Sequence, residues 1–192
     1  MVFSSVVLIW FSGLVFVVFH SFTAAQVCKA WCYQHGLTEP KYRLLYSVVA
    51  VLSTAAWLFY VQQLPDAPFY AWDGTMQMLF WLIQAVGLLI ALAAFSPIDG
   101  LVFLGLKKAK SGQDPFVVQG VYRWMRHPMY MGAMLILLAM PEQTWNGFHF
   151  TLVICLYFIL GSRLEERRML AEHPDYADYQ QQVAAFIPKI RR

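Results

Sequence analysis

Charged residues are scarce in this sequence of 192 residues. Lysine, arginine, aspartate and glutamate together make up 13% of it, whereas a typical soluble domain contains about 25%. Hydrophobic residues account for 59%. This composition excludes a soluble globular domain, and it excludes intrinsic disorder, which requires low hydrophobicity and high charge. Three cysteines are also too few for a disulfide framework. A small polytopic membrane protein is the class that remains.

Long hydrophobic runs are present instead. A helix needs about 20 apolar residues to cross a bilayer core about 30 Å thick. Three runs without a charged residue meet that length: Val2–Phe22, Leu44–Leu64 and Thr75–Phe95. Trp145–Leu164 is also long enough, whereas Met129–Met140 reaches only about 18 Å as a helix. We predict an all-α polytopic membrane protein with five transmembrane helices, the last two forming a hairpin, followed by a cytoplasmic C-terminal helical segment.

Basic residues lie on one side of the predicted spans. All 14 fall within residues 29–43, 107–126 and 163–192, whereas the charges of the opposite loops are Asp66, Asp73 and Glu142. Because lysine and arginine are retained on the cytoplasmic side of a membrane, we predict that the N-terminus is outside and the C-terminus is in the cytoplasm.

The cysteines do not have the spacing of a zinc finger. Cys28 and Cys32 are four residues apart on the predicted cytoplasmic side, where they should remain thiols, and Cys155 is alone in the fifth span. No second pair of ligands lies nearby at a finger-like spacing. We therefore expect no metal site, and we expect the cysteines to be small buried apolar residues.

One polar segment leads directly into the short fourth helix. Pro128 suits the first turn of a helix and disfavours helical geometry at the residue before it, so His127 is predicted to precede the helix. A helix N-terminus with Arg126 beside it attracts an anionic group such as a ligand carboxylate. The alternative interpretation is an anchor of basic and aromatic residues at the membrane surface.

A second polar segment follows the fifth span. Glu165 and Glu166 directly follow it, among several arginines that include Arg163 and Arg168. Glu165 is three residues from Arg168, so the run could pair its charges within one helix. The charge pattern fits a solvated helix face and a functional site equally well.

Together these segments form a recognisable pattern. The motifs are Gly120-Val-Tyr-Arg-Trp-Met-Arg-His-Pro-Met-Tyr-Met-Gly132, Glu165-Glu-Arg, Tyr176-Ala-Asp-Tyr179 and Phe186-Ile-Pro188. They resemble those of the isoprenylcysteine carboxyl methyltransferase superfamily, which includes phospholipid methyltransferases and methanethiol S-methyltransferases. The earlier half is similar to the methanethiol S-methyltransferase and NnrU-like branch, at Phe19-His-Ser21, residues 41–46 and residues 99–106.

The resemblance implies S-adenosyl-L-methionine as the cofactor, in a pocket that faces the cytoplasm. By motif position, the expected cofactor-binding residues are Phe116, Val117, Tyr122, Arg126, His127, Pro128, Tyr130, Glu165 and Tyr176. The chain has His173-Pro-Asp-Tyr176 where members commonly have one residue more. The resemblance therefore leaves open by one position whether Glu165 or its neighbour Glu166 is the glutamate that contacts the cofactor.

The expected function is the transfer of a methyl group to a small lipophilic acceptor, with a thiol favoured. The expected catalytic residues are Glu165, Glu166, Arg163, His20 and Arg43, of which His20 and Arg43 lie at the predicted cytoplasmic ends of the first two spans. The alternatives are a prenylcysteine carboxyl or phospholipid amine methyltransferase, a nicotinamide-dependent reductase, or a non-enzymatic NnrU-like accessory protein.

The predicted setting is the inner membrane of a bacterium. We expect residues 1–95 to form the acceptor side and residues 96–192 the cofactor-binding region of one integrated domain. Partners are expected to be the small substrate and membrane lipids, with no nucleic acid, and the oligomeric state is left open.

Overall fold

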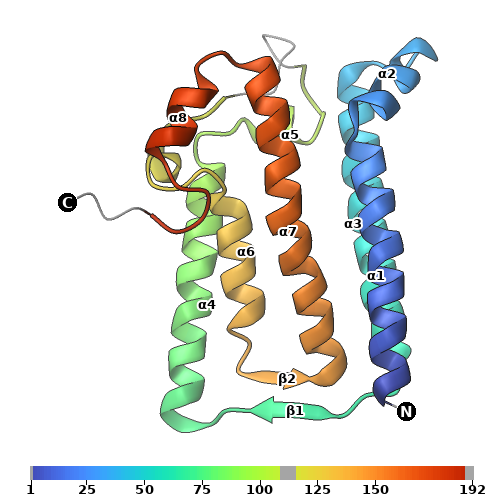
Figure 1. Ribbon diagram of the computed structural model, residues 1–192, viewed down its shortest axis with the longest axis vertical. Coiled ribbons are helices and arrows are strands. Elements are labelled where there is room, and N and C mark those ends of the chain that lie inside the picture. The colour runs from blue at the N-terminus through green and yellow to red at the C-terminus, as the bar shows by residue number, and fades with distance from the viewer. Residues whose placement is uncertain (1, 109–115, 189–192) are drawn as a thin grey trace. The chain divides into compact units, whose positions relative to one another are not determined.

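The computed structural model describes residues 2–108 and 116–188, and these are mostly helical (Figure 1). The elements in chain order are α1 (Val2–Ala24), α2 (Gln26–Gln34), α3 (Glu39–Gln63), β1 (Pro68–Ala71), α4 (Gly74–Phe95), α5 (Gly100–Phe103), η1 (Gly120–Arg123), α6 (Pro128–Leu138), β2 (Glu142–Thr144), α7 (Trp145–Glu172) and α8 (Tyr176–Gln182).

Four helices are long and apolar enough to cross a membrane. They are α1, α3, α4 and α7, with 22 to 28 residues each. Each contains one of the four long hydrophobic runs of the sequence almost completely, and much of their apolar surface is exposed in the protein itself. A bilayer would cover that surface. These findings confirm the class of an all-α polytopic membrane protein. The short helix α6 has 11 residues and extends about 16 Å.

The chain divides into two compact units. The first comprises Met1–Phe69, Asp99–Gly112 and Gln143–Val153, and the second comprises Tyr70–Ile98, Gln113–Glu142 and Ile154–Arg192. The division passes through α7, so that its first turns belong to the first unit and the rest to the second. The functional division that we expected near residue 96 stays a prediction.

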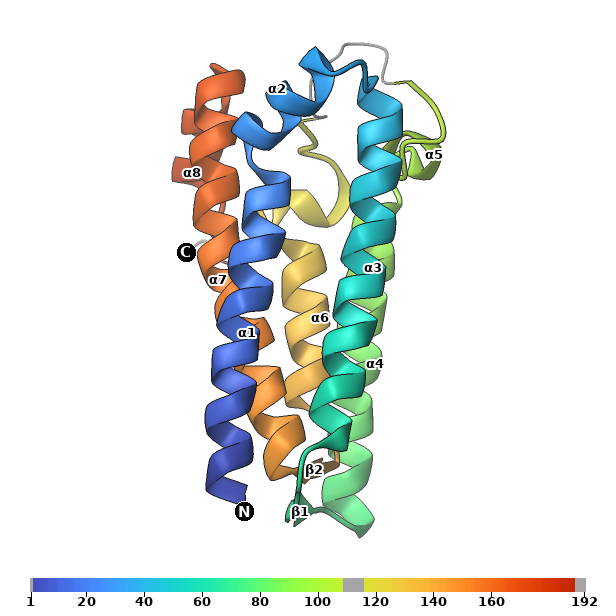
Figure 2. The same cartoon turned by 90° about the vertical axis from the view of Figure 1, so that its right-hand side faces the viewer.

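In the first unit, α1 and α3 run side by side (Figures 1 and 2). Gly13 permits this packing, because a Cβ atom there would lie 2.8 Å from Val153 Cγ1 and 2.9 Å from Trp57 Cζ2. The Trp57 ring stacks on Phe16 at 4.9 Å, and its Nε1 donates a 3.0 Å hydrogen bond to Ser12 Oγ. A buried aromatic side chain with a satisfied N–H thus joins the two helices.

In the second unit, α4 packs closely against α6 (Figure 1). A Cβ atom at Gly132 would lie 2.5 Å from the Gly87 carbonyl oxygen, and one at Gly87 would lie 2.8 Å from the Gly132 oxygen. Small residues let helix backbones approach in this way within membranes. Gln84 Nε2 on α4 donates a 3.0 Å hydrogen bond to the Ile136 carbonyl oxygen on α6. These contacts fix the position of α6.

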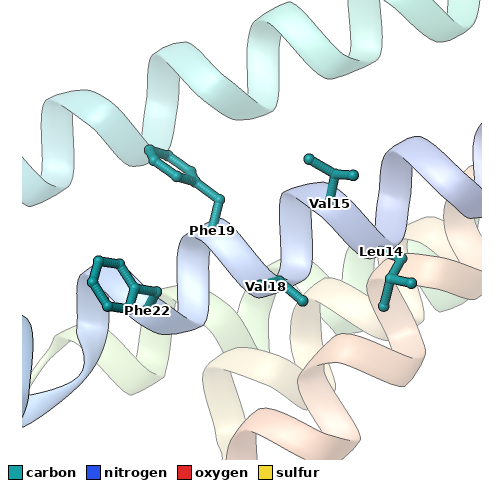
Figure 3. A pocket seen from close by; sticks show the side chains of 5 residues that line it. All are labelled: Leu14, Val15, Val18, Phe19 and Phe22. Atoms are coloured by element: carbon teal, nitrogen blue, oxygen red, sulfur yellow. The ribbon is translucent and has the colours of Figure 1, made fainter.

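A hollow of about 520 Å³ lies over α1 in the first unit. Its lining consists of apolar side chains of α1 alone: Leu14, Val15, Val18, Phe19 and Phe22 (Figure 3). With no polar group in this lining, the hollow fits hydrocarbon and offers no reactive group.

The cysteines depart from the expectation that all are buried. Cys155 is buried in α7, but Cys28 and Cys32 in α2 are both half-exposed. The prediction of a buried apolar role was therefore wrong for these two, because α2 lies outside the spanning helices and buries none of its residues.

Candidate functional site

The second unit brings most of the predicted site residues together around the start of α6. As predicted, His127 immediately precedes this helix, with φ −122° and ψ 59°, and Pro128 occupies its first turn. The preceding segment turns at Gly120, whose φ of +57° lies in the left-handed region that glycine adopts without strain. This turn and the proline orient His127 and Arg126 at the end of α6.

Arg126 and His127 both contact Glu166 of α7. Arg126 Nε donates a 2.7 Å hydrogen bond to Glu166 Oε1, and Nη2 lies 2.7 Å from the same oxygen. His127 Nε2 lies 2.9 Å from the same oxygen. Since an ionised carboxylate can only accept, His127 carries a hydrogen on Nε2. All three side chains are largely buried: Arg126 is 10% exposed, His127 5% and Glu166 12%. The interpretation that the glutamates of this run pair only within their own helix is therefore wrong for Glu166.

Glu165 has a different environment from its neighbour. Its Oε2 accepts a 3.0 Å hydrogen bond from the Tyr130 hydroxyl and lies 3.8 Å from His127 Nδ1. Its side chain is 38% exposed. Among the described residues, no hydrogen bond to its other oxygen is seen. Glu165 therefore offers a carboxylate oxygen to a ligand, whereas Glu166 is engaged within the protein.

The Tyr130 ring is held between two other rings. It stacks on His127 with a centroid distance of 5.5 Å, and on Phe158 of α7 with a distance of 4.9 Å. The planes deviate from parallel by only 5° and 7°. The sequence reasoning missed Phe158, although it lies seven residues before Glu165 and so on the same face of the helix. This stacking aims the Tyr130 hydroxyl at Glu165.

The C-terminal segment runs alongside the residues before α6. The N–H groups of Arg126 and His127 donate to the carbonyl oxygens of Ala184 and Ala185, each at 2.9 Å. Arg126 Nη1 also donates to the carbonyl oxygens of Gln180, at 3.0 Å, and Val183. Arg126 thus holds both Glu166 and the segment after α8.

Gln180 completes the contacts of Glu166. Its Nε2 donates a 2.8 Å hydrogen bond to Glu166 Oε2. Phe186 contacts the His127 ring at a centroid distance of 5.6 Å. The sequence reasoning assigned no role to Gln180 or to the Phe186 side chain in the site. Nothing in their local sequence indicates these contacts, which depend on how the C-terminal segment folds back.

Aromatic rings form a cluster beside these carboxylates. Phe116 lies 5.4 Å from each of His173, Tyr176 and Tyr179, measured between ring centroids. Tyr179 donates a 2.6 Å hydrogen bond to the Tyr122 carbonyl oxygen. This bond ties α8 to η1.

The phenols of this cluster stay protonated over the physiological pH range. Burial, and then the negative charge of Glu165, raise the pKa of Tyr122 to about 12. Burial raises the pKa of Tyr176 to about 12, with a further contribution from Glu166. Their hydroxyl groups therefore act as neutral hydrogen-bonding groups beside the flat apolar ring faces.

The other predicted residues have different surroundings. Val117 is half-buried next to Phe116 in the chain, and Arg163 is exposed on α7. His20 lies in the first unit between Phe16 and Tyr46, at centroid distances of 5.1 and 5.5 Å. Arg43, also in the first unit, pairs with Glu39 at 3.1 Å. The cofactor-binding role of Val117 and the catalytic roles of Arg163, His20 and Arg43 stay predictions.

The residues around the start of α6 combine three chemical features. A half-exposed carboxylate can accept hydrogen bonds from an ammonium or a hydroxyl group. Aromatic faces suit a planar heterocycle, and the first amide donors of α6 lack partners within their helix. Among residues 2–108 and 116–188, no three His, Cys, Asp or Glu side chains are grouped as metal ligands. The site is thus suited to a polar organic ligand that contains a flat ring.

Comparison with known proteins gives a consistent family. The model of the family described as "NnrU protein" matches residues 8–186. A methanethiol S-methyltransferase of Pseudomonas deceptionensis is 28% identical over 188 residues, covering 92% of this chain and 70% of that protein. The methanethiol S-methyltransferase of Crocosphaera subtropica is 28% identical, covering 92% of this chain and 72% of that protein. The one of Mycobacterium tuberculosis is 29% identical, covering 91% of this chain and 74% of that protein. No solved structure gives a significant match.

Proposed function

Since the chain belongs to the NnrU protein family, we propose that it is a membrane methyltransferase that uses S-adenosyl-L-methionine and methylates a small lipophilic thiol. The similar proteins named methanethiol S-methyltransferase support the reaction class and the thiol. The observation that carries the proposal is Glu165, a half-exposed carboxylate held by Tyr130 beside a cluster of aromatic rings.

The residues present fit this cofactor. Its ammonium group and ribose hydroxyls need an acceptor, which Glu165 supplies, and its adenine needs flat apolar faces, which Phe116 and Tyr176 supply. Its carboxylate suits the N-terminus of α6, where Pro128 begins the helix. When bound, S-adenosyl-L-methionine supplies a methyl group already activated on its sulfonium sulfur.

In this proposal Arg126 acts through Glu166, and His127 lies near both glutamates. All the Arg126 donors named above point to Glu166 or to carbonyl oxygens of the C-terminal segment. The positive charge of Arg126 still favours the binding of an anionic group at the start of α6. His127 directs Nδ1 toward Glu165, 3.8 Å away, and this nitrogen can accept a proton. An acceptor thiol that loses its proton would pass it to the pair formed by His127 and Glu165.

The membrane arrangement is part of the proposal. We infer that α6 is a fifth, shortened span, that α6 and α7 form a hairpin, and that the site faces the cytoplasm of a bacterial cell. The basic residues of segments 29–43, 107–126 and 163–192 support this orientation. Fusing a reporter that is active only in the cytoplasm to the C-terminus tests it, and an inactive reporter on a fully expressed fusion would contradict it.

Binding of S-adenosylhomocysteine, measured by calorimetry on the purified protein, tests the cofactor assignment. We expect saturable binding to the wild type. Glu165→Gln should weaken it roughly 10- to 100-fold, because a hydrogen bond to a charged group contributes about 1.5–3 kcal/mol. Glu142→Gln is the matched control, since Glu142 is exposed in β2 at the other end of α6. Absence of saturable binding to the wild type would refute the proposal.

The acceptor is tested separately with methyl-labelled cofactor. Small alkyl thiols, prenylcysteines and phosphatidylethanolamine are offered to the same membranes. We expect label on the thiol, in a product that dissolves in organic solvent. Transfer to prenylcysteine or to the lipid amine would replace the thiol assignment, while cofactor binding without transfer to any acceptor would favour an accessory role.

A further inference from the structure

The charges at the start of α6 balance only when His127 is protonated. Arg126 and Glu166 form one ion pair, with Nη2 2.7 Å from Oε1. Glu165 is the second carboxylate, and among the residues that the structure describes His127 is the cation paired with it. One positive and two negative charges leave the group at −1 when the imidazole is neutral, and an imidazolium brings it to zero.

His127 lies between the two carboxylates. Its Nε2 is 2.9 Å from Glu166 Oε1, and its Nδ1 is 3.8 Å from Glu165 Oε2. Only 5% of the side chain is exposed, and an unbalanced charge in such a place is costly. A neutral ring with its hydrogen on Nε2 would also turn the lone pair of Nδ1 toward the charged Glu165.

The N-terminus of α6 acts in the opposite direction, because its partial positive charge disfavours a cation beside it. Histidine is the side chain that ordinarily changes charge between about pH 5 and 8, so a new charge near it can change its protonation state. A positive charge brought to Glu165 would therefore favour the neutral ring.

The groups around His127 come from several elements. They are Arg126 in the preceding segment, Tyr130 on α6, Glu165 and Glu166 on α7, Tyr122 on η1 and Tyr176 on α8 near the same carboxylates, and Phe186 in the C-terminal segment. Carboxyl groups ordinarily titrate near pH 4, phenols near pH 10 and guanidinium groups above pH 12. A change of charge near neutral pH within this set is therefore assigned to the imidazole.

We propose that His127 loses a proton when the cofactor binds, and that this loss prepares Nδ1 to accept the proton of the thiol. The inference rests on the function proposed above. Glu165 accepts hydrogen bonds from the ammonium group of the cofactor, whose charge replaces that of the imidazolium. The N–H bond at Nδ1 breaks, its electron pair stays on the nitrogen, and the proton passes to solvent.

The coupling sets an order of events and a pH dependence. His127 keeps its hydrogen on Nε2 and its contact with Glu166, so the ring holds its orientation while Nδ1 becomes an acceptor. Because a proton is released, a higher pH favours cofactor binding. The affinity should rise by up to about tenfold per pH unit while the free protein holds this proton, and should level off above that range.

Calorimetry with S-adenosylhomocysteine at about pH 6.5 tests the coupling, because this ligand has the same amino-acid group as the cofactor. Repeating the titration in buffers with different heats of ionisation gives the number of protons released. We expect up to about one proton per bound ligand for the wild type. Glu165→Gln and His127→Asn should release none, the first because it removes the shared carboxylate. His35→Asn, a change at an exposed histidine at the end of α2, is the matched control and should match the wild type.

The outcomes separate this inference from the cofactor assignment. Saturable binding to the wild type without proton release would overturn the inference and leave the assignment intact, whereas absence of binding would refute the assignment. Undiminished release from His127→Asn or Glu165→Gln would also overturn it. Circular dichroism checks the fold of both variants, and Glu165→Gln suffices if His127→Asn does not fold. Nitrogen NMR of histidine-labelled protein adds a direct readout: Nδ1 of His127 should lose its proton on binding, and Nε2 should keep its own.

Discussion

Glu165 and Glu166 are neighbours in the chain, and we predict opposite consequences for their replacement. Glu166→Ala should destabilise the protein strongly and Glu165→Gln only slightly. The Glu166 carboxylate accepts hydrogen bonds from Arg126, His127 and Gln180, and only 12% of its side chain is exposed. Its removal leaves the Arg126 guanidinium buried without its carboxylate.

The expected magnitudes differ by several-fold. Breaking a buried ion pair by removing one partner costs about 3–5 kcal/mol. For a chain of this size that corresponds to a decrease of roughly 6–20 °C in melting temperature. Glu165 accepts one hydrogen bond from Tyr130 and is 38% exposed, so Glu165→Gln should cost about 1 kcal/mol or less.

Thermal unfolding of the detergent-solubilised protein, followed by circular dichroism, measures both variants. Limited proteolysis adds a local readout, because loss of Glu166 should also release α8 and the segment held by Arg126. Glu142→Gln serves again as the control. The reasoning is refuted if Glu166→Ala melts with the wild type, or if Glu165→Gln is the less stable of the two.

Three other predictions concern packing, titration and helix capping. Gly132→Ala should cost about 1–3 kcal/mol in thermal unfolding, since its Cβ would meet the Gly87 carbonyl oxygen at 2.5 Å; an unchanged melting temperature would contradict the close packing of α4 and α6. Because burial raises the pKa of Tyr122 from 10.0 to about 12, the folded protein keeps this phenol protonated after the unfolded chain has lost the proton. Its contribution to stability is therefore complete below pH 10 and is lost as pH rises toward 12; Tyr122→Phe should show less of this alkaline loss in unfolding measured across that range. Asp66→Ala should lower the free energy of unfolding in denaturant by about 1 kcal/mol, because Asp66 Oδ1 accepts a 3.0 Å hydrogen bond from the Asn146 N–H at the start of α7. Asp73→Ala is the control, because the Asp73 side chain makes no capping hydrogen bond to α4.

Much of the fold could be predicted from the amino-acid sequence alone. The four long hydrophobic runs correspond to α1, α3, α4 and α7, because the thickness of a bilayer sets the length that each span must reach. His127 precedes α6 because a proline fixes the backbone locally and disfavours a helical residue before it. The residues of the candidate site were predictable for the same reason: polar groups in an otherwise apolar chain are few, and they fall in two segments.

The tertiary structure decided which partners those groups have. Successive residues on a helix are turned about 100° from one another, so Glu165 and Glu166 face different surroundings although their side chains are identical. Glu166 contacts Arg126, forty residues earlier in the chain, and Gln180, which lies beyond the end of α7. Such pairings depend on the packing of α6, α7 and the C-terminal segment, which no local pattern encodes. Sequence thus determined which groups are available for chemistry, and packing determined which of them remain free to act.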